Sequence, residues 1–161
     1  MSVYVLVVGP DPAGPDVVAQ SEEIGRLLAE EGAIVVTGGL GGAMEAASRG
    51  AAESGGITVG LLPGTSRDAA NPHVTVAIPT GMGEGRNVLN VRAADAVIAV
   101  AGEFGTLSEI AFALKTGVPV VGLGTWELMK AGRPVDAFVR VDTPSEAVRE
   151  ALRLAGAEGR R

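Results

Sequence analysis

Two glycine-rich stretches and one carboxylate are the parts of this sequence best suited to chemistry. The first stretch runs from Thr37 to Met44 (TGGLGGAM), and the second runs from Ala101 to Thr106 (AGEFGT), with Glu109 three residues further on. Glycine lets the backbone adopt positive φ angles and lets a ligand approach closely. A turn of this kind that opens a helix presents free N–H groups and the positive end of the helix dipole to anions. The two stretches therefore predict a site for a phosphate-type ligand.

Glu103 lies inside the second stretch and opposes this assignment. A carboxylate close to a phosphate costs on the order of 1 kcal/mol or more unless it points away or is paired. We therefore expect the backbone from Gly105 onward to face the ligand, with Glu103 turned to solvent, a partner subunit, or a ligand hydroxyl or amine. Thr106 suits the N-cap of the following helix and can also bond a phosphate oxygen. Glu109 then occupies the capping-box position, so spacing alone leaves both capping and chemistry open.

Short β-branched runs that alternate with longer amphipathic segments must position these turns. Strands are expected within residues 3–9, 33–39, 57–64, 74–81, 95–102, 118–124 and the first part of 137–156, and helices within 16–32, 41–56, 85–94, 106–117 and the rest of 137–156. This alternation predicts an α/β fold, a single Rossmann-like doubly wound parallel sheet with helices on both faces. Residues 1–161 are expected to form one nucleotide-binding domain, with 156–161 as a frayed tail.

Three strand-to-helix turns are expected at one edge of this sheet, because ligands of such folds bind beyond the carboxyl ends of the strands. These turns follow the first strand at Gly9, the second at Thr37 and the fifth at Ala101. The two glycine-rich turns are not Walker loops, since no Gly-Lys-Ser/Thr follows, and they are not clean dinucleotide fingerprints. Small residues at such turns can serve packing alone, but two dense turns in one sheet favour a ligand.

The composition argues against several other functions. The chain has 161 residues, a net charge of −6, no cysteine and one histidine, His73. An acidic chain is not typical of nucleic-acid binding, so no such partner is expected. With one histidine and no thiolate, no metal site is expected. No apolar run reaches the roughly 20 residues of a membrane span, and the start lacks a basic signal-peptide region, so a cytoplasmic protein without a membrane partner is expected.

The two glycine-rich stretches resemble motifs of the family typified by the Lonely Guy cytokinin-activating phosphoribohydrolases. The sequence is more similar to the short bacterial branch of DprA/Smf-related proteins, which includes molybdenum cofactor carrier proteins. The likeness extends from Val3 to about Gly122. The family motif GGGxxGxM falls on residues 37–44, with Thr37 in place of the first glycine. The motif PGGxGTxxE falls on residues 101–109, with Ala101 and Glu103 in place of a proline and a glycine.

The turns and the resemblance together give a set of candidate site residues. In the hydrolases an upstream arginine pairs with the motif glutamate, which implies that Arg86 and Glu109 are catalytic if this protein is an enzyme. The hydrolases carry an Arg-Lys pair where this chain has Arg86-Asn87. Apart from its place in the motif, a methionine at position 44 is typical of the hydrophobic core. The expected ligand- or phosphate-binding residues are Gly9, Thr37, Gly38, Gly39, Gly41, Gly42, Met44, Arg86, Gly102, Gly105 and Thr106.

Two functions follow from the resemblance. In the first, the protein binds a nucleotide or a molybdopterin-type cofactor as a carrier, requires no cofactor of its own, and uses Arg86 as a charge clamp. In the second, it is a nucleoside 5′-monophosphate phosphoribohydrolase, and Glu109 stabilises an oxocarbenium-like state or aligns water to release free base and ribose 5-phosphate. The resemblance also implies a homodimer or homotetramer.

The family is often labelled lysine decarboxylase, but this chain does not fit that chemistry. A PLP enzyme needs a lysine that forms a Schiff base with the cofactor. The only lysines are Lys115, late in an expected helix, and Lys130, in an expected surface segment. We therefore expect no PLP-dependent decarboxylase.

Overall fold

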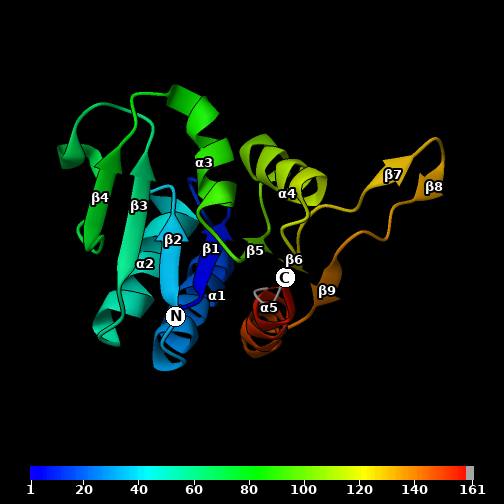
Figure 1. The fold of residues 1–161 in the computed structure, drawn as a ribbon, viewed down its shortest axis with the longest axis horizontal. Helices are drawn as coiled ribbons and strands as arrows, with labels where there is room; N and C mark the ends of the chain where they lie inside the picture. The colour runs from blue at the N-terminus through cyan, green and yellow to red at the C-terminus, as the bar shows by residue number, and fades with distance from the viewer. Residues whose placement is uncertain (159–161) are drawn as a thin grey trace.

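The computed structural model describes residues 1–158 and is built around one parallel sheet (Figure 1). Its seven strands lie in the order β4-β3-β2-β1-β5-β6-β9, and every neighbouring pair is parallel. The predicted Rossmann-like α/β fold is confirmed. The strands are β1 (Tyr4–Val8), β2 (Ile34–Thr37), β3 (Thr58–Leu62), β4 (Val76–Pro79), β5 (Ala96–Val100), β6 (Val120–Leu123) and β9 (Val139–Val141).

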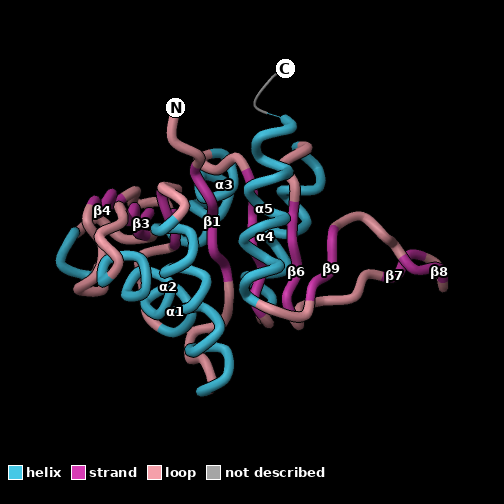
Figure 2. The backbone as a smooth tube through the Cα atoms, turned by 90° about the horizontal axis from the view of Figure 1, so that it is seen from below, coloured by secondary structure: helices cyan, strands magenta, loops and turns pink. Residues whose placement is uncertain are grey.

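Helices cover both faces of the sheet (Figure 2). The side chains of β1 alternate between two cores. Val5 and Val7 pack with the helices at Pro15–Glu30 (α1) and Pro144–Glu158 (α5), while Leu6 and Val8 pack with those at Arg86–Arg92 (α3) and Phe104–Thr116 (α4). This two-sided burial explains why the central strands are continuous apolar runs. The helices are α1 (Pro15–Glu30), α2 (Gly42–Glu53), α3 (Arg86–Arg92), α4 (Phe104–Thr116) and α5 (Pro144–Glu158), with short 3₁₀ turns η1 (Arg67–Ala69) and η2 (Gly83–Gly85).

Two glycines allow α1 and α2 to pack backbone against backbone. A Cβ atom added at Gly25 would lie 2.0 Å from the carbonyl oxygen of Ala47, and one added at Gly50 would lie 1.9 Å from the carbonyl oxygen of Glu22. No other residue type fits such distances without moving a helix. The two contacts fix where α2 lies, and with it the glycine-rich turn that precedes α2.

The strand order reverses direction at β1, which lies between β2 and β5. The chain runs from β1 through α1 to β2 on one side, and the later strands β5 and β6 continue on the other side. The carboxyl ends of β1 and β5 therefore border a crevice between turns that lead to different sides of the sheet. In open α/β sheets this topological switch point is where ligands bind.

Three details differ from the sequence-based expectations. α4 begins at Phe104 instead of Thr106. α5 continues through Glu158, so residues 156–158 are helical where a frayed tail was expected, and 159–161 lie outside the described residues. A hairpin of β7 (Met129–Lys130) and β8 (Arg133–Pro134) forms a separate antiparallel sheet that the sequence did not predict. No helix within residues 1–158 has the length and apolar character needed to cross a membrane.

Candidate functional site

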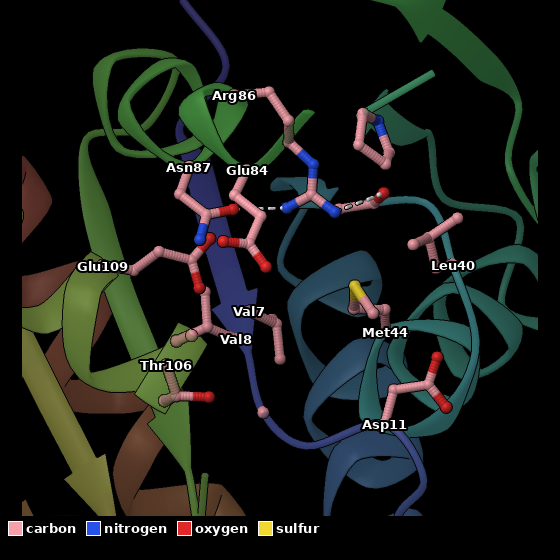
Figure 3. Close-up of a pocket in the computed structure, with 14 residues that line it drawn as sticks. Val7, Val8, Asp11, Leu40, Met44, Glu84, Arg86, Asn87, Thr106 and Glu109 are labelled. Atoms are coloured by element: carbon pink, nitrogen blue, oxygen red, sulfur yellow. Dashed lines mark hydrogen bonds between the residues drawn. The ribbon is translucent and has the colours of Figure 1, made fainter. Parts of the chain in front are cut away.

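A pocket of about 400 Å³ lies at the switch point, beyond the carboxyl ends of β1 and β5. All three predicted turns contribute to its wall, as does the start of α3. Figure 3 shows Thr106 and Glu109 on one side, Leu40, Met44 and Asp11 on the other, and Arg86 reaching in from α3. The pocket is lined by Val7, Val8, Gly9, Asp11, Gly38, Leu40, Met44, Pro63, Glu84, Arg86, Asn87, Gly105, Thr106 and Glu109.

Arg86 is a buried cation in the wall of this pocket, with only 8% of its surface exposed. Its Nη1 donates to Oδ1 of Asn87 (2.6 Å), and its Nη2 donates to the carbonyl oxygen of Gly38 (3.4 Å). Its Nε is buried and has no hydrogen-bond partner in the protein. Burial lowers the pKa of Arg86, while Glu109 and Glu84 act in the opposite direction. The guanidinium is thus oriented by two contacts, and its buried Nε–H donor is left without a partner.

Asn87 links Arg86 to the first turn of α4. Its side-chain oxygen accepts from Arg86, and its Nδ2 donates to Oγ of Ser108 (3.2 Å). The Ser108 hydroxyl donates in turn to the carbonyl oxygen of Gly105 (2.6 Å). A lysine, which the hydrolases carry here, has no acceptor atom and cannot make the bond to Arg86. Asn87 is therefore a positioning residue, although sequence analysis had noted it only as a departure from the hydrolase pattern.

Glu109 is a buried carboxyl group in the same pocket, with 6% of its surface exposed. Its Oε1 accepts from Nδ2 of Asn90 on α3 (2.7 Å). Burial raises the pKa of Glu109 to about 7, against the lowering effects of the Asn90 hydrogen bond and the Arg86 charge. Arg86 and Glu109 line one pocket as the resemblance implied, yet no ion pair within 4 Å joins them among the described residues.

The expected N-cap role of Thr106 is wrong, and of the two roles left open for Glu109 the structure excludes the capping box. The N-cap of α4 is Glu103, whose side chain makes no capping bond. Thr106 lies in the first turn of the helix, is 4% exposed, and packs so closely on Gly102 that an added Cβ there would lie 2.5 Å from its own Cβ. Because the helix starts earlier than expected, Glu109 falls beyond the capping-box position and turns into the pocket instead.

Glu103 lies outside the pocket, as the sequence analysis expected. Its side chain is exposed and does not belong to the pocket wall, which begins at Gly105 in this turn. The indole Nε1 of Trp126 donates to its carbonyl oxygen (3.2 Å). The negative charge that opposed a phosphate site is therefore directed elsewhere.

The other candidate residues divide into two groups. Gly9, Gly38, Met44 and Gly105 line the pocket directly. The remaining candidates do not line it and shape the turns instead: Thr37 Oγ1 accepts from the Gly39 amide (3.1 Å), Gly39, Gly42 and Gly102 have positive φ, and Gly41 is the N-cap of α2.

Sequence analysis missed several residues of the site. Asp11 lies in the first loop, where the sequence leaves it able to reach ligand hydroxyls or to cap the first helix, and it was not among the candidates. Leu40 was noted only as a variable position of the first motif, and Glu84 and Pro63 were given no role. All four line the pocket. Asn90, the partner of Glu109, is fully buried and follows Arg86 by one helical turn. The spacing of four residues was the signal that could have placed Asn90 on the same face of α3 as Arg86.

A Rossmann-like domain with a pocket at its switch point defines the class of protein. The chain matches the SLOG cluster4 family over residues 2–148, and it belongs to this family. It is 39% identical over 142 residues to a protein from Archaeoglobus fulgidus, a match that covers 88% of this chain and 89% of that protein. The family resemblance inferred from the two motifs is thereby confirmed.

Solved structures of other proteins are also similar to this chain. The molybdenum cofactor binding protein from Rippkaea orientalis is similar with a TM-score of 0.87 and 32% identity, over 96% of this chain and 98% of that one. The molybdenum cofactor carrier protein from Chlamydomonas reinhardtii is similar with a TM-score of 0.85 and 31% identity, over 97% and 99% of the two chains. At 18% identity and a TM-score of 0.69, the DNA processing protein A from Helicobacter pylori shares the fold alone.

Proposed function

We propose that the protein is a carrier that binds a phosphorylated small molecule of the molybdopterin type in the pocket at the switch point. One observation carries the proposal. The buried Nε of Arg86 has no partner in the protein, and Arg86 lines the same pocket as the first turn of α4. An unpaired buried donor costs about 1–3 kcal/mol, and an anionic ligand would satisfy it.

The start of α4 supplies further donors. The first backbone bond within the helix runs from Leu107 N to the carbonyl oxygen of Glu103, so the N–H groups of the preceding turn have no partner within the helix. Gly105 lines the pocket, and nothing lies within 4 Å of the place where its Cβ would be. A phosphate can therefore approach this backbone closely, between the helix end and Arg86.

The rest of the pocket suits a ligand that also offers hydrogen-bond donors. Three carboxyl groups, those of Asp11, Glu84 and Glu109, share the wall with the single cation Arg86. A bare phosphate would be disfavoured there, whereas the amino and ring N–H groups of a pterin can donate to carboxylates. The names of the Rippkaea and Chlamydomonas proteins support the molybdenum cofactor as the ligand.

The test is the pterin content of the purified protein. The protein is produced in a bacterium that makes molybdenum cofactor, and the fluorescence of oxidised pterin is measured per mole of chain. We expect Arg86→Ala and Gly105→Asp to lower the pterin content about tenfold or more, the loss of one charge-assisted contact. Arg67→Ala, which changes an exposed arginine in η1, is the matched control. Pterin content that is unaffected by both pocket variants would refute the proposal, as would the absence of pterin from the unaltered protein.

A second candidate is the phosphoribohydrolase, which the position of Glu109 favours. A carboxyl group that lines a ligand-sized pocket and has a pKa of about 7 is typical of groups that transfer protons or stabilise a cation. The protein is incubated with AMP, and free adenine and ribose 5-phosphate are measured by chromatography. Release that disappears in Glu109→Gln would assign this activity. No release from AMP, together with bound pterin, would leave the carrier function alone.

A further inference from the structure

The β7–β8 hairpin forms an arm that projects from the body of the protein (Figures 1 and 2). We define the arm as residues 128–135, closed at its base by the bond from Val135 N to the carbonyl oxygen of Leu128 (2.8 Å). Its two-residue turn, Ala131 and Gly132, has positive φ at both positions, the geometry of a tight hairpin. An isolated two-stranded hairpin is at best marginally stable in water, so a built arm of this kind calls for a partner surface.

The tip of the arm combines an apolar side chain with two cations. Met129 is 62% exposed, and Lys130 and Arg133 beside it are also exposed. Neither side chain forms an ion pair with a carboxylate of residues 1–158. Most of the other arginines described here are held by a carboxylate, a carbonyl or an aromatic ring, so the tip is a rare concentration of unpaired positive charge on an acidic chain.

A groove between α3 and α4 has the complementary chemistry. It has a volume of about 480 Å³ and is lined by Glu84, Asn87, Val88, Phe104, Gly105, Ser108 and Phe112. Phe104 is 75% exposed and Val88 is 38% exposed, so the groove offers apolar surface to solvent. The exposed carboxylate of Glu84 supplies negative charge in its wall. Glu84, Asn87 and Gly105 also line the ligand pocket, so the groove and the pocket share a rim.

We infer that the arm of a second copy of this chain docks in the groove. Met129 packs against Phe104 and Val88, while Lys130 and Arg133 face Glu84. The arm does not lie in the groove of its own chain, because both views show it projecting away from α3. In a dimer with a two-fold axis, the arm of each copy occupies the groove of the other copy. The contact therefore forms twice, and the dimer is closed.

Docking would also complete the ligand site. The pocket within one chain holds three carboxyl groups and one guanidinium, an unfavourable balance for a phosphorylated ligand. The arm of the second copy brings Lys130 and Arg133 to the rim at Glu84, where they offset its charge and close the pocket opening. This consequence rests on the proposed function, whereas the docking itself does not.

The chain contains no cysteine, so docking can be tested with single-cysteine variants. Val88→Cys in the groove and Ala131→Cys at the arm tip are placed in separate chains of different size, mixed, and mildly oxidised. We expect a disulfide-linked heterodimer. Glu53→Cys, at the end of α2 on the other face of the sheet, is the control and should not cross-link to Ala131→Cys. No heterodimer with Val88→Cys, or an equal yield with the control, would overturn the inference.

A second measurement guards against a misfolded variant and separates the two proposals. Phe104→Asp alters an exposed side chain that no core requires, and it should convert the dimer to monomer by light scattering. Pterin content is measured in Lys130→Glu/Arg133→Glu, where we expect about a fivefold loss from two partly exposed charge contacts. Cross-linking needs no ligand, so a protein without pterin can still show docking. Retained pterin without cross-linking would refute the arm and leave the carrier function in place.

Discussion

At the scale of single residues, Glu109 is the group whose protonation the fold controls most strongly. Its carboxyl group is 6% exposed, and its oxygen accepts one hydrogen bond, from Asn90. Burial disfavours the ionised form, which raises the pKa from the ordinary 4.5 to about 7. The folded state therefore binds a proton more tightly than the unfolded chain does, and stability must depend on pH in this range.

The sign of that dependence gives the first prediction. Because the folded pKa is the higher one, the stabilisation from protonated Glu109 is fully present below pH 4.5 and is lost as the pH rises to about 7. Glu109→Gln stays neutral, so at pH 8 we expect this variant to be more stable than the unaltered protein by roughly 3 kcal/mol. Below pH 4.5 the two proteins should be equally stable. Urea unfolding at a series of pH values measures the difference.

Glu127→Gln is the control for this experiment, because Glu127 is exposed to solvent. It should leave the pH dependence of the unaltered protein in place. A Glu109→Gln curve that remains parallel to that of the unaltered protein across pH 4.5–7 would show that Glu109 does not hold its proton in the folded state.

Gly38 carries the second prediction at this scale. A Cβ atom there would lie 2.7 Å from Nη2 of Arg86 and 2.7 Å from Sδ of Met44. Both neighbours are the ends of flexible side chains, so Gly38→Ala should fold with a loss of about 1 kcal/mol but displace the Arg86 guanidinium. We expect pterin content to fall severalfold, close to that of Arg86→Ala. Gly64→Ala is the control, because nothing lies within 4 Å of the place of its added Cβ. An equal pterin content in Gly38→Ala, Gly64→Ala and the unaltered protein would contradict the prediction.

Sequence patterns located the residues of the site better than they assigned their roles. The turns at Gly38 and Gly105 and the pair Arg86 and Glu109 were placed correctly in one pocket. The capping role failed because the start of α4 depends on the conformation of the preceding loop, which Thr106 as a residue type does not reveal. The bond between Asn90 and Glu109 joins two helices, and such contacts between distant segments leave no periodic signal in a single sequence.

At the scale of elements, the packing of α1 on α2 is set by direct contact between their backbones. Their contact at Gly25 and Gly50 leaves no room for a methyl group, because the atoms that an added Cβ would meet belong to the backbone. Backbone atoms cannot rotate away as side chains do, so the whole of α2 would have to shift. The first glycine-rich stretch lies directly before α2 and continues into its start, which connects this packing to the ligand pocket.

The third prediction follows from this contact between the two helices. Gly25→Ala or Gly50→Ala should lower the free energy of unfolding by about 3 kcal/mol, at the upper end of the cost of overpacking. The gain in helix propensity from glycine to alanine, about 1 kcal/mol, acts in the opposite direction and is too small to compensate. Denaturant unfolding measures both effects together. If either variant proves more stable than the unaltered protein, the two helices are not held by backbone contact.

The strands and helices of the main sheet could be predicted from the sequence, whereas the arm could not. Strands such as β5 and helices such as α1 carry long apolar patterns that their burial on the sheet requires. The arm has strands of only two residues each, with exposed side chains on both. Its structure comes from a tight turn at Ala131 and Gly132, where alanine is not a residue that marks a left-handed turn. Strands whose side chains are all exposed leave no hydrophobic pattern to detect.

At the scale of the whole molecule, the distribution of charge matters more than its total. The net charge is −6, and the cation that lines the ligand pocket, Arg86, shares it with three carboxyl groups. Unpaired positive charge is instead placed at the end of the arm, on Lys130 and Arg133. In the dimer that we propose, a two-fold axis would bring the arm of each copy to the acidic surface of the other.

The last prediction tests that complementarity by exchanging the charges. Glu84→Lys, and separately Lys130→Glu/Arg133→Glu, should each place like charges at the contact and weaken the dimer about tenfold, since exposed ion pairs contribute up to about 1 kcal/mol each. The chain that carries all three substitutions restores opposite charges and should dimerise nearly as well as the unaltered protein. Lys115→Glu, in the last turn of α4, also replaces one charge by its opposite but should have little effect. The differences should shrink at high salt, because mobile ions screen exposed charges. Sedimentation at several protein concentrations gives the dissociation constants, and a triple variant no better than its parents would mean that Glu84 and the arm do not meet.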